Sequence, residues 1–569
     1  MCFLVSCGGG GANQTSSPPP SLPVISSFLA TPTAVSAGRT STLTWQVSGA
    51  SSLQLTNVTN SLAVTSTSLV VTPAVTTTYM MTASNAVGSV DSSVTVNVSQ
   101  SVPIASVTIN AGEATQPIAP DFLGIGHSMG DTLSLIGTSS TNMNPIYEQL
   151  LKNLTQYANA PLLIREEAEG SSGADNPNVY NAQRLAALAQ LSKDAGAHFM
   201  VGVDFVDDVV STATAETQEL VTGLGGILDA IELGDEPDLY GINGERPEGA
   251  AWDYADYLAD YEQFAPAILA VSGGLKLEAP VFSGVNATAG FMANLNSFVS
   301  GHASQLAVVT AHHYSGNGCN GATEPPDYLL TEAAVDGDTQ PLTGPIEIGQ
   351  YLTAAQQVGL PFRIGELNSI NCGGQLGVSN TFSSALWAMD IAFAYANAGV
   401  SGVNFFATAD PNNADAYTPF DFTYTETNGV RTYSIRNINP LYYGMLLFAQ
   451  AVQNKAQLAP VSLATNANIK AWATIDPNGT VRLLLLNKDE SASGAVAISL
   501  PSYGQATVTR LTAPSYFSTT GVILGGQTFD GSVNGTPQGS AYSEIVQANS
   551  DTYTVALPSI SAALVTIQK

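Results

Sequence analysis

Short apolar segments alternate with longer helix-compatible segments across the middle of the chain, and this rhythm constrains the fold more than any other feature. Each apolar segment is followed by a stretch long enough for a helix. The eight segments are residues 122–126, 161–165, 198–206, 228–234, 280–285, 306–312, 361–365 and 400–406. Eight consecutive strand–helix units are typical of an α/β protein, so we expect a (β/α)8 TIM barrel.

Two of the intervening segments carry the apolar stripe of a helix. One has Tyr254, Tyr257, Leu258, Tyr261, Phe264 and Ile268 at helical spacing, and the other has Phe382, Leu386, Met389 and Phe393. Ser379 and Asn380 precede the second stripe and are candidate caps. A last helix is expected over residues 439–450.

The chain of 569 residues is too long for one ordinary core, and its composition changes along its length. Residues 1–23 combine a lipobox-like start, with Cys7 as the candidate lipidated residue, and a flexible linker. Residues 24–100 carry short alternating strands and resemble bacterial immunoglobulin-like β-sandwich domains. We expect the barrel over 104–455 and a β-sandwich over 456–569, with a strand within 104–112 joining the C-terminal sheet.

The charge balance limits the possible partners. With 45 acidic residues against 16 Lys and Arg, the formal charge is −29, which disfavours binding to nucleic acid. The basic residues of the central region are scattered singly, so a groove for a long sulfated polymer is not expected. A small or weakly charged glycan fits this composition better.

Four cysteines are present, none in a metal-binding spacing, so no metal site or cofactor is expected. Cys319 and Cys372 lie in glycine-rich segments that follow two predicted strands. A disulfide between them would staple adjacent loops and would suit an exported protein. Two free thiols are the alternative.

Two acidic residues follow the fourth and seventh predicted strands. Glu236 lies in a polar turn with a proline, and Glu366 follows residues 361–365 directly. At one rim of a barrel these carboxylates could reach the separation of about 5.5 Å that retaining glycosidases use. Glu366 is then the candidate nucleophile and Glu236 the candidate acid/base. A solvated loop acid is the alternative for each glutamate taken alone.

Other acids flank these two positions. We expect Glu232 and Asp238 to serve structure around the first site. Glu166, Glu167 and Glu169 follow the second predicted strand and could contact sugar hydroxyls.

From residue 104 to the C-terminus the chain resembles glycoside hydrolase family 79, which contains β-glucuronidases and heparanases. The segments that carry the likeness are Glu232-Leu-Gly-Asp-Glu-Pro-Asp238, His312-His-Tyr314, Gly365-Glu-Leu-Asn-Ser369, Cys372-Gly-Gly374, Gly377-Val-Ser-Asn-Thr-Phe382, Ala385-Leu-Trp387, Gly399-Val-Ser-Gly-Val-Asn-Phe405 and Asn439-Pro-Leu-Tyr-Tyr443. The resemblance implies Glu236 as acid/base, Glu366 as nucleophile and Tyr314 as a hydrogen-bond donor to the nucleophile.

The remaining binding residues come from the same resemblance. Asp235 stands where the family usually has an asparagine that contacts the sugar 2-hydroxyl. Gly373 and Gly374 match the loop whose N–H groups hold a uronate carboxylate, and Asn371 stands where aromatic hydroxyls are common. The family's Val-Asn-Phe-His pattern ends here in Phe406.

The sequence therefore predicts an exported, surface-tethered, monomeric and retaining exo-β-glycosidase. Its expected activity is release of glucuronic acid or 4-O-methylglucuronic acid from oligosaccharide or polysaccharide glucuronides. Two alternatives remain open: a neutral-sugar β-glycosidase on the same scaffold, and a non-catalytic carbohydrate-binding surface lipoprotein.

Overall fold

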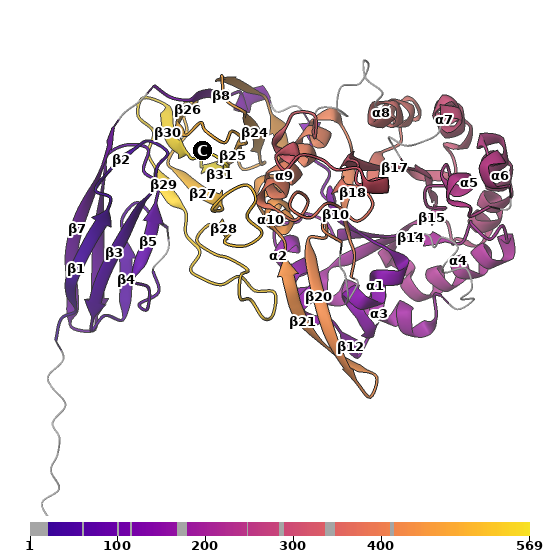
Figure 1. Cartoon of the computed structure of the whole chain (residues 1–569), viewed down its shortest axis with the longest axis horizontal. Helices are drawn as coiled ribbons and strands as arrows, with labels where there is room; N and C mark the ends of the chain where they lie inside the picture. The colour runs from indigo at the N-terminus through magenta and orange to yellow at the C-terminus, as the bar shows by residue number, and fades with distance from the viewer. Residues whose placement is uncertain are drawn as a thin grey trace, which may run out of the picture.

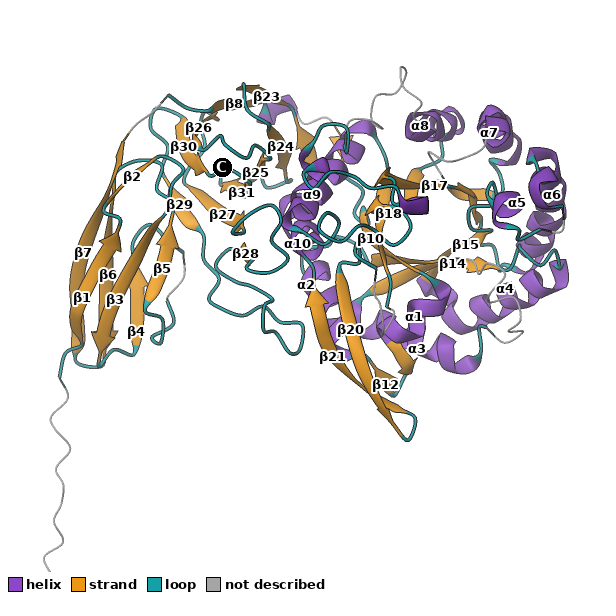
Figure 2. Cartoon of the chain, viewed as in Figure 1, coloured by secondary structure: helices purple, strands orange, loops and turns teal. Residues whose placement is uncertain are grey.

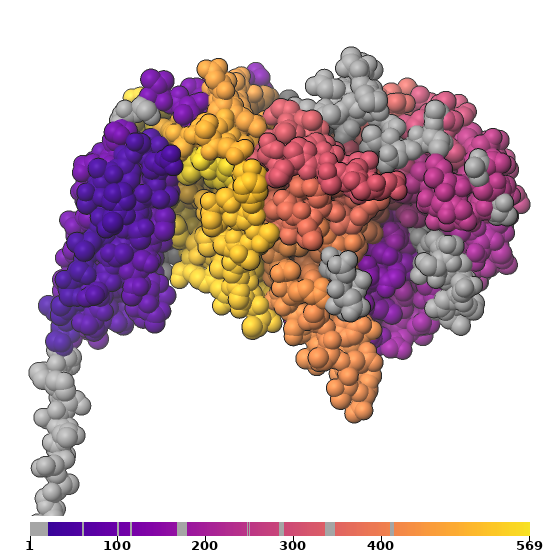
Figure 3. Space-filling model, viewed as in Figure 1, coloured from indigo at the N-terminus to yellow at the C-terminus, as the bar shows by residue number. Residues whose placement is uncertain are grey.

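The computed structural model describes residues 21–59, 62–99, 102–113, 116–167, 179–246, 248–283, 289–335, 347–409 and 415–569. Three parts lie side by side, with the C-terminal β domain between the N-terminal strands and the barrel (Figures 1 and 3). The candidate lipidation residue Cys7 and the rim acid Glu169 lie outside the described residues. Among the helices of the described segments, none has the length and apolar character needed to span a bilayer.

Eight parallel strands close the barrel in sequence order, which confirms the predicted fold class. The strands are β10 (Leu123–His127), β13 (Leu162–Glu166), β14 (Ala197–Val203), β15 (Leu228–Leu233), β16 (Leu277–Phe282), β17 (Leu306–Gly316), β18 (Phe362–Ile370) and β19 (Gly402–Ala407). The longer helices surround the strands in Figure 2. The helices are α1 (Met129–Ile136), α2 (Pro145–Thr155), α3 (Ala182–Ala195), α4 (Val210–Leu224), α5 (Tyr240–Asn243), α6 (Tyr254–Val271), α7 (Ala289–His302), α8 (Glu347–Val358), α9 (Phe382–Ala398) and α10 (Pro440–Val452).

Several strand boundaries differ from the sequence prediction, and those of β16 and β18 are explained by buried residues that the pattern does not reveal. β16 begins at Leu277 rather than at Pro280, because the proline lies inside the strand, where the register with β17 shifts. β18 continues to Ile370, and all nine of its residues are buried. Glu366 therefore lies inside the strand and pairs with His312 of β17, whereas we expected it in the turn beyond.

The predicted caps of α9 are also wrong. Thr381 is the N-cap residue. The Ser379 hydroxyl accepts a hydrogen bond from the Gln375 N–H at 3.0 Å, and the Asn380 side chain accepts one from the Gly377 N–H at 2.7 Å. Both side chains stabilise the turn before the helix instead.

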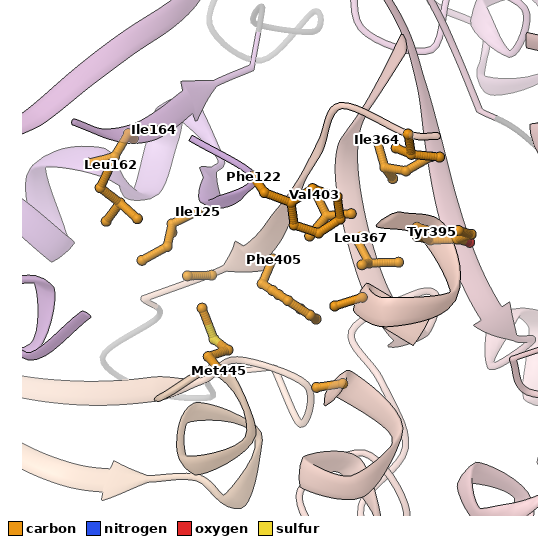
Figure 4. Close-up of a cluster of buried hydrophobic side chains, with 14 of the residues drawn as sticks. Phe122, Ile125, Leu162, Ile164, Ile364, Leu367, Tyr395, Val403, Phe405 and Met445 are labelled. Atoms are coloured by element: carbon orange, nitrogen blue, oxygen red, sulfur yellow. The ribbon is translucent and has the colours of Figure 1, made fainter. Parts of the chain in front are cut away.

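The core of the barrel fills the space between the strands and the helices α9 and α10. Figure 4 shows apolar side chains of β10, β13, β18 and β19 gathered there with Tyr395 of α9 and Met445 of α10. Ile125, Ile164 and Val403 are fully buried. This dry packing fixes the strands whose C-terminal ends form the rim.

Two hairpins add to the barrel. The strands β11 (Gly137–Ser139) and β12 (Asn142–Met143) form one, and β20 (Phe420–Thr427) and β21 (Val430–Ile438) form the other. The longer hairpin projects from the body of the molecule beside β12 (Figure 1). The Asn142 side chain donates to the Arg431 carbonyl and accepts a hydrogen bond from the Arg431 N–H. These two bonds join the two hairpins.

The N-terminal part consists of two sheets in the orders β1-β3-β5 and β2-β7-β6-β4. Its strands are β1 (Val24–Thr31), β2 (Ala34–Ser36), β3 (Ser41–Ser48), β4 (Ser52–Leu55), β5 (Ser68–Val71), β6 (Thr77–Asn85) and β7 (Gly88–Ser99). Trp45 and Tyr79 are buried in its core. The immunoglobulin-like identity of this part stays a prediction.

The C-terminal part has one large and one small sheet, and it takes two strands from the segment before the barrel. β8 pairs with β23 and β26, and β9 pairs with β22. The strands are β8 (Ala105–Ile109), β9 (Gln116–Pro117), β22 (Gln457–Ala459), β23 (Val461–Thr465), β24 (Ile469–Ile475), β25 (Val481–Asn487), β26 (Gly494–Ser499), β27 (Ala506–Thr512), β28 (Ile523–Leu524), β29 (Glu544–Val546), β30 (Thr552–Leu557) and β31 (Ser561–Ile567).

The N-terminal sandwich is fastened to the C-terminal domain by backbone pairing. The Thr59 N–H donates to the Ser543 carbonyl at 2.9 Å, and the Ile545 N–H donates to the Asn57 carbonyl at 2.9 Å. The partly buried Arg510 pairs with Glu544 and reaches the Thr72 carbonyl at 3.4 Å. The sandwich is thus docked onto its neighbour.

Candidate active site

The two predicted catalytic glutamates meet at the carboxyl end of the barrel. Glu366 lies on β18, and Glu236 follows β15. The Nδ1 atom of His312, on β17, is 2.9 Å from Glu236 Oε1 and 3.8 Å from Glu366 Oε2. Since both oxygens are this close to one atom, they lie no more than 6.7 Å apart, the two distances combined. Residues from two distant segments therefore share one site.

A buried arginine binds three of the site's carboxylates. Arg165 lies at the end of β13 and is fully buried. Its Nε and Nη2 atoms bind Glu232 at 2.6 and 2.8 Å, Nη2 also binds Asp235 at 2.5 Å, and Nη1 binds Glu366 Oε2 at 2.8 Å. This cation compensates much of the buried negative charge and fixes one oxygen of Glu366.

The other oxygen of Glu366 is held by Tyr314. The Tyr314 hydroxyl donates a short hydrogen bond to Glu366 Oε1. Burial, followed by the charge of Glu366, raises the pKa of Tyr314 well above its usual value, so this hydroxyl stays a neutral donor. Glu366 is thus oriented at both oxygens, and the catalytic roles of Glu366 and Tyr314 stay predictions.

The protonation of Glu236 is set by its surroundings. Burial and then the charge of Asp235 raise the pKa of Glu236 to about 8, against the opposing effect of Arg165. Burial also raises the pKa of Glu366, and the charges of His312 and Arg165 oppose that rise. Glu236 is therefore protonated at neutral pH and can donate a proton, while Glu366 has the contacts that favour an anion.

Glu236 sits on a strained turn. Its φ of 47° lies in the left-handed region, which is unfavourable for a glutamate. The turn is held because the Glu236 N–H donates to the Val281 carbonyl at 3.0 Å and the Leu239 N–H donates to the Glu236 carbonyl at 2.8 Å. Such strain is often found where a side chain must be aimed at a ligand.

Asp235 lies beside the acid/base candidate. Its N–H donates to the Tyr240 hydroxyl at 3.1 Å, and its carboxylate receives Arg165. The side chain is 25% exposed, so it lines the site. Its contact with a sugar hydroxyl stays a prediction.

The loop after β18 is internally bonded. Cys372 and Cys319 form the predicted disulfide, with their Cα atoms 5.3 Å apart. The Asn371 side chain accepts a hydrogen bond from the Gly318 N–H at 2.8 Å, and the Gly374 N–H donates to the Asn371 carbonyl at 3.3 Å. The amide oxygen of Asn371 and the N–H of Gly374 thus serve the loop itself.

An acidic side chain lies against the same loop. A Cβ atom added at Gly373, whose φ is 86°, would be 2.8 Å from Asp415 Oδ1. Asp415 also hydrogen-bonds the Tyr417 hydroxyl, and Tyr417 hydrogen-bonds Tyr314. A negative group therefore lies close to the two glycines that were predicted to hold a uronate carboxylate.

The flanking acids differ in their partners. Glu232 is buried against Arg165, and Asp238 binds the N–H and hydroxyl of Ser283 at 2.9 and 2.7 Å. Both positions agree with the structural roles we expected. Glu166 forms a buried ion pair with Arg184.

One residue set has the donor atoms of a metal site. Asp235, His312 and Glu366 offer ligand atoms within 4.8 Å of one another. Arg165 already binds both carboxylates, however, and its positive charge beside them disfavours a second cation. The arrangement fits an arginine-anchored acid pair better.

Sequence reasoning missed Arg165 and His312 as site residues. Arg165 was counted among the scattered basic residues, and His312 entered only through the resemblance. One signal was available, because an arginine at the end of an apolar strand must find a carboxylate when it is buried.

Sequence comparisons match parts of this chain to one family model and to two curated proteins. Residues 471–564 match the family described as "Glycosyl hydrolase family 79 C-terminal beta domain". A β-glucuronidase from Aspergillus niger is 26% identical over 284 residues, which cover 46% of this chain and 48% of the fungal protein. A β-glucuronidase from Neurospora crassa is 28% identical over 204 residues, covering 32% of this chain and 34% of that protein. The match thus spans about half or less of these relatives.

Solved structures agree on the fold. The structure of a 4-O-α-L-rhamnosyl-β-D-glucuronidase from Fusarium oxysporum superposes with a TM-score of 0.63 and 19% identity, covering 81% of this chain and 100% of that one. A family 51 α-L-arabinofuranosidase from Bifidobacterium longum gives a TM-score of 0.56 and 16% identity, covering 82% and 100%. At these identities the likeness concerns the architecture alone.

Proposed function

We propose that this protein is a family 79 glycoside hydrolase that cleaves β-glycosides with retention of configuration. The observation that best supports this proposal is the unequal set of contacts of Glu236 and Glu366. Both carboxyls lie close to His312, but of the two only Glu366 is bound by Arg165 and Tyr314. One carboxyl is therefore suited to hold a proton and its neighbour to hold a charge. The upper bound of 6.7 Å between their oxygens is compatible with a retaining enzyme.

In the first step, a Glu366 oxygen forms a bond to the anomeric carbon as the glycosidic C–O bond breaks. The leaving oxygen takes the proton of Glu236. Arg165 and Tyr314 keep the attacking carboxylate oriented, so little reorganisation is needed during attack. The product is a glycosyl ester of Glu366 and a free alcohol.

In the second step, the Glu236 carboxylate takes a proton from water, and the water oxygen attacks the same carbon. The bond to Glu366 breaks, and its carboxylate is restored. Glu236 can change role because the charge of Glu366 disappears on glycosylation, which lowers the pKa of its neighbour. The sugar leaves with its original configuration.

The substrate class follows from the relatives and from the loop after β18. We propose β-linked glucuronic acid, or its 4-O-methyl ether, on oligosaccharides or polysaccharides, since the curated relatives are named β-glucuronidases. One observation favours a second candidate, a neutral-sugar β-glycosidase, because Asp415 lies against Gly373 and would repel a uronate carboxylate there.

An exported location is part of the proposal. The disulfide between Cys319 and Cys372 supports it, because such bonds persist outside reducing compartments. Tethering through Cys7 and a monomeric state belong to the same proposal.

A set of nitrophenyl β-glycosides tests the function. Wild type should hydrolyse the glucuronide faster than the xyloside or galactoside, and NMR should show the β-anomer of the sugar first. Glu366→Gln should abolish turnover, and azide should restore it to Glu236→Ala as a β-glycosyl azide. First appearance of the α-anomer would contradict retention, and faster turnover of a neutral glycoside would favour the second candidate. No turnover of any glycoside by wild type would refute the enzyme proposal.

A further inference from the structure

A third rim acid, Glu167, lies next to the catalytic pair and has no role in the two steps above. It follows β13 directly, two residues after Arg165, and its N–H donates to the carbonyl of His127 at 3.1 Å. His127 ends β10, so this bond fixes the residue between the first two strands of the barrel. This bond extends the ladder between β10 and β13 by one residue.

Glu167 lies on the same face of the strand direction as Arg165, because side chains two residues apart along a strand point to the same side. The charges of Asp235 and Glu366 act on its carboxyl and, after burial, raise the pKa of Glu167 well above its usual value, against the opposing effect of Arg165. Glu167 is only half-buried, so a solvent-accessible space borders it. Glu167 therefore borders the site in which Arg165 binds Asp235 and Glu366.

Ser128 is the N-cap residue of α1, where a serine usually accepts a hydrogen bond from the helix backbone. Here it makes no such cap bond, and its side chain acts on Glu167 by lowering the pKa of that carboxyl. The neighbouring Glu166 forms a buried ion pair with Arg184 instead of facing the site acids.

We propose that Glu167 is a specificity-determining residue that hydrogen-bonds a ring hydroxyl of the sugar, on the side of the pocket formed by β10 and β13. This inference rests on the proposed function and deepens it. The carboxyl of Glu167 can accept a hydrogen bond from a hydroxyl and, when protonated, can also donate one to it.

Deoxy substrates test this contact. We would measure kcat/KM for wild type, Glu167→Ala and Glu167→Gln on the nitrophenyl glycoside and on its 2-, 3- and 4-deoxy analogues. Glu167→Ala should lose about 10- to 100-fold on the parent glycoside, the usual worth of a hydrogen bond to such a group. On one deoxy analogue the variant and wild type should agree within about twofold, because the contact is already absent there. Glu167→Gln should retain more activity than Glu167→Ala.

Controls separate contact from folding. Glu219→Ala, on the exposed face of α4, should leave every ratio unchanged, and melting temperatures should show that the Glu167 variants fold. Ser128→Ala should lower kcat/KM in the same pattern but by a smaller factor. An equal loss on all analogues, or no loss on the parent, would overturn the proposal.

The binding experiment remains decisive if wild type hydrolyses nothing. Calorimetric titration of the monosaccharides into Glu366→Gln and into Glu366→Gln with Glu167→Ala measures the pocket without turnover. The contact is supported even then if the double variant binds one sugar more weakly than Glu366→Gln does. This difference in affinity should disappear for the deoxy analogue of that sugar. Equal binding to both variants, or no binding to either, refutes it.

Discussion

Asp235→Asn should move the whole pH–rate profile to lower pH. The negative charge of Asp235 raises the pKa of Glu236, which must be protonated to act as the acid, and it also raises the pKa of Glu366, which must be ionised. Removing that charge lowers both pKa values. Activity should therefore appear at lower pH on the acidic limb and disappear at lower pH on the basic limb.

The size of the shift can be worked from the geometry. The ligand atoms of Asp235 and Glu366 lie within 4.8 Å of each other. Two unit charges at about this distance and an effective dielectric constant of about 20 interact by about 3.5 kcal/mol, equivalent to about 2.5 pKa units. Arg165 binds Asp235 at 2.5 Å and offsets part of this effect. We expect a shift of about 1 unit, which would bring the basic limb from near pH 8 to near pH 7.

The assay is kcat/KM of the nitrophenyl glycoside from pH 3 to pH 10. Asparagine keeps an oxygen that can accept from Arg165, so the fold should persist and kcat at the optimum should stay within about tenfold. Asp229→Asn, on the strand β15 that precedes Asp235, is a matched control, because this side chain is 47% exposed and binds His198 away from the site. Limbs that stay in place, or move to higher pH, would refute the electrostatic reasoning.

Three further changes probe other parts of the molecule. Tyr314→Phe should reduce kcat by about 10- to 100-fold with little change in KM, since it removes a donor to the nucleophile, and steady-state kinetics would reveal an equal effect on KM instead. Serine at both Cys319 and Cys372 should lower the melting temperature, because the bond closes a loop of 53 residues worth about 4 kcal/mol; unchanged melting would contradict this. Arg510→Met should leave Glu544 unpaired within the C-terminal domain and remove the hydrogen bond to the Thr72 carbonyl, so the melting temperature should fall and proteolysis of the N-terminal sandwich should quicken. Hydrolysis of a small glycoside should stay constant, and unchanged proteolysis would contradict the reasoning.

The eight barrel strands could be predicted because each is a compact apolar run. The strand boundaries were harder to predict where polar residues are buried. Glu366 and Asn368 interrupt the apolar pattern of β18, yet both are buried because Arg165, Tyr314 and backbone carbonyls satisfy them. The strand continues through positions that look like a loop in the sequence.

The long hairpin β20–β21 was missed although it has a local signal. Asn428 and Gly429 have φ values of 52° and 78°, as in the two-residue turns that favour Asn-Gly. Alternating residues flank them on both sides. This period of two differs from the strand–helix period of the barrel on either side of the hairpin, so the barrel rhythm does not predict it.

The assignment of roles to the site acids depended on contacts that no local pattern contains. Arg165 reaches Glu366 across 201 positions and Glu232 across 67, and His312 reaches Glu236 across 76. Sequence patterns could place these carboxyls at one rim, because parallel strands end on one side of a barrel. They could not show that the arginine and the tyrosine both bind Glu366 and leave Glu236 with burial and the charge of Asp235 as its main influences. That unequal sharing of partners is what makes one glutamate a proton donor and the other an anion.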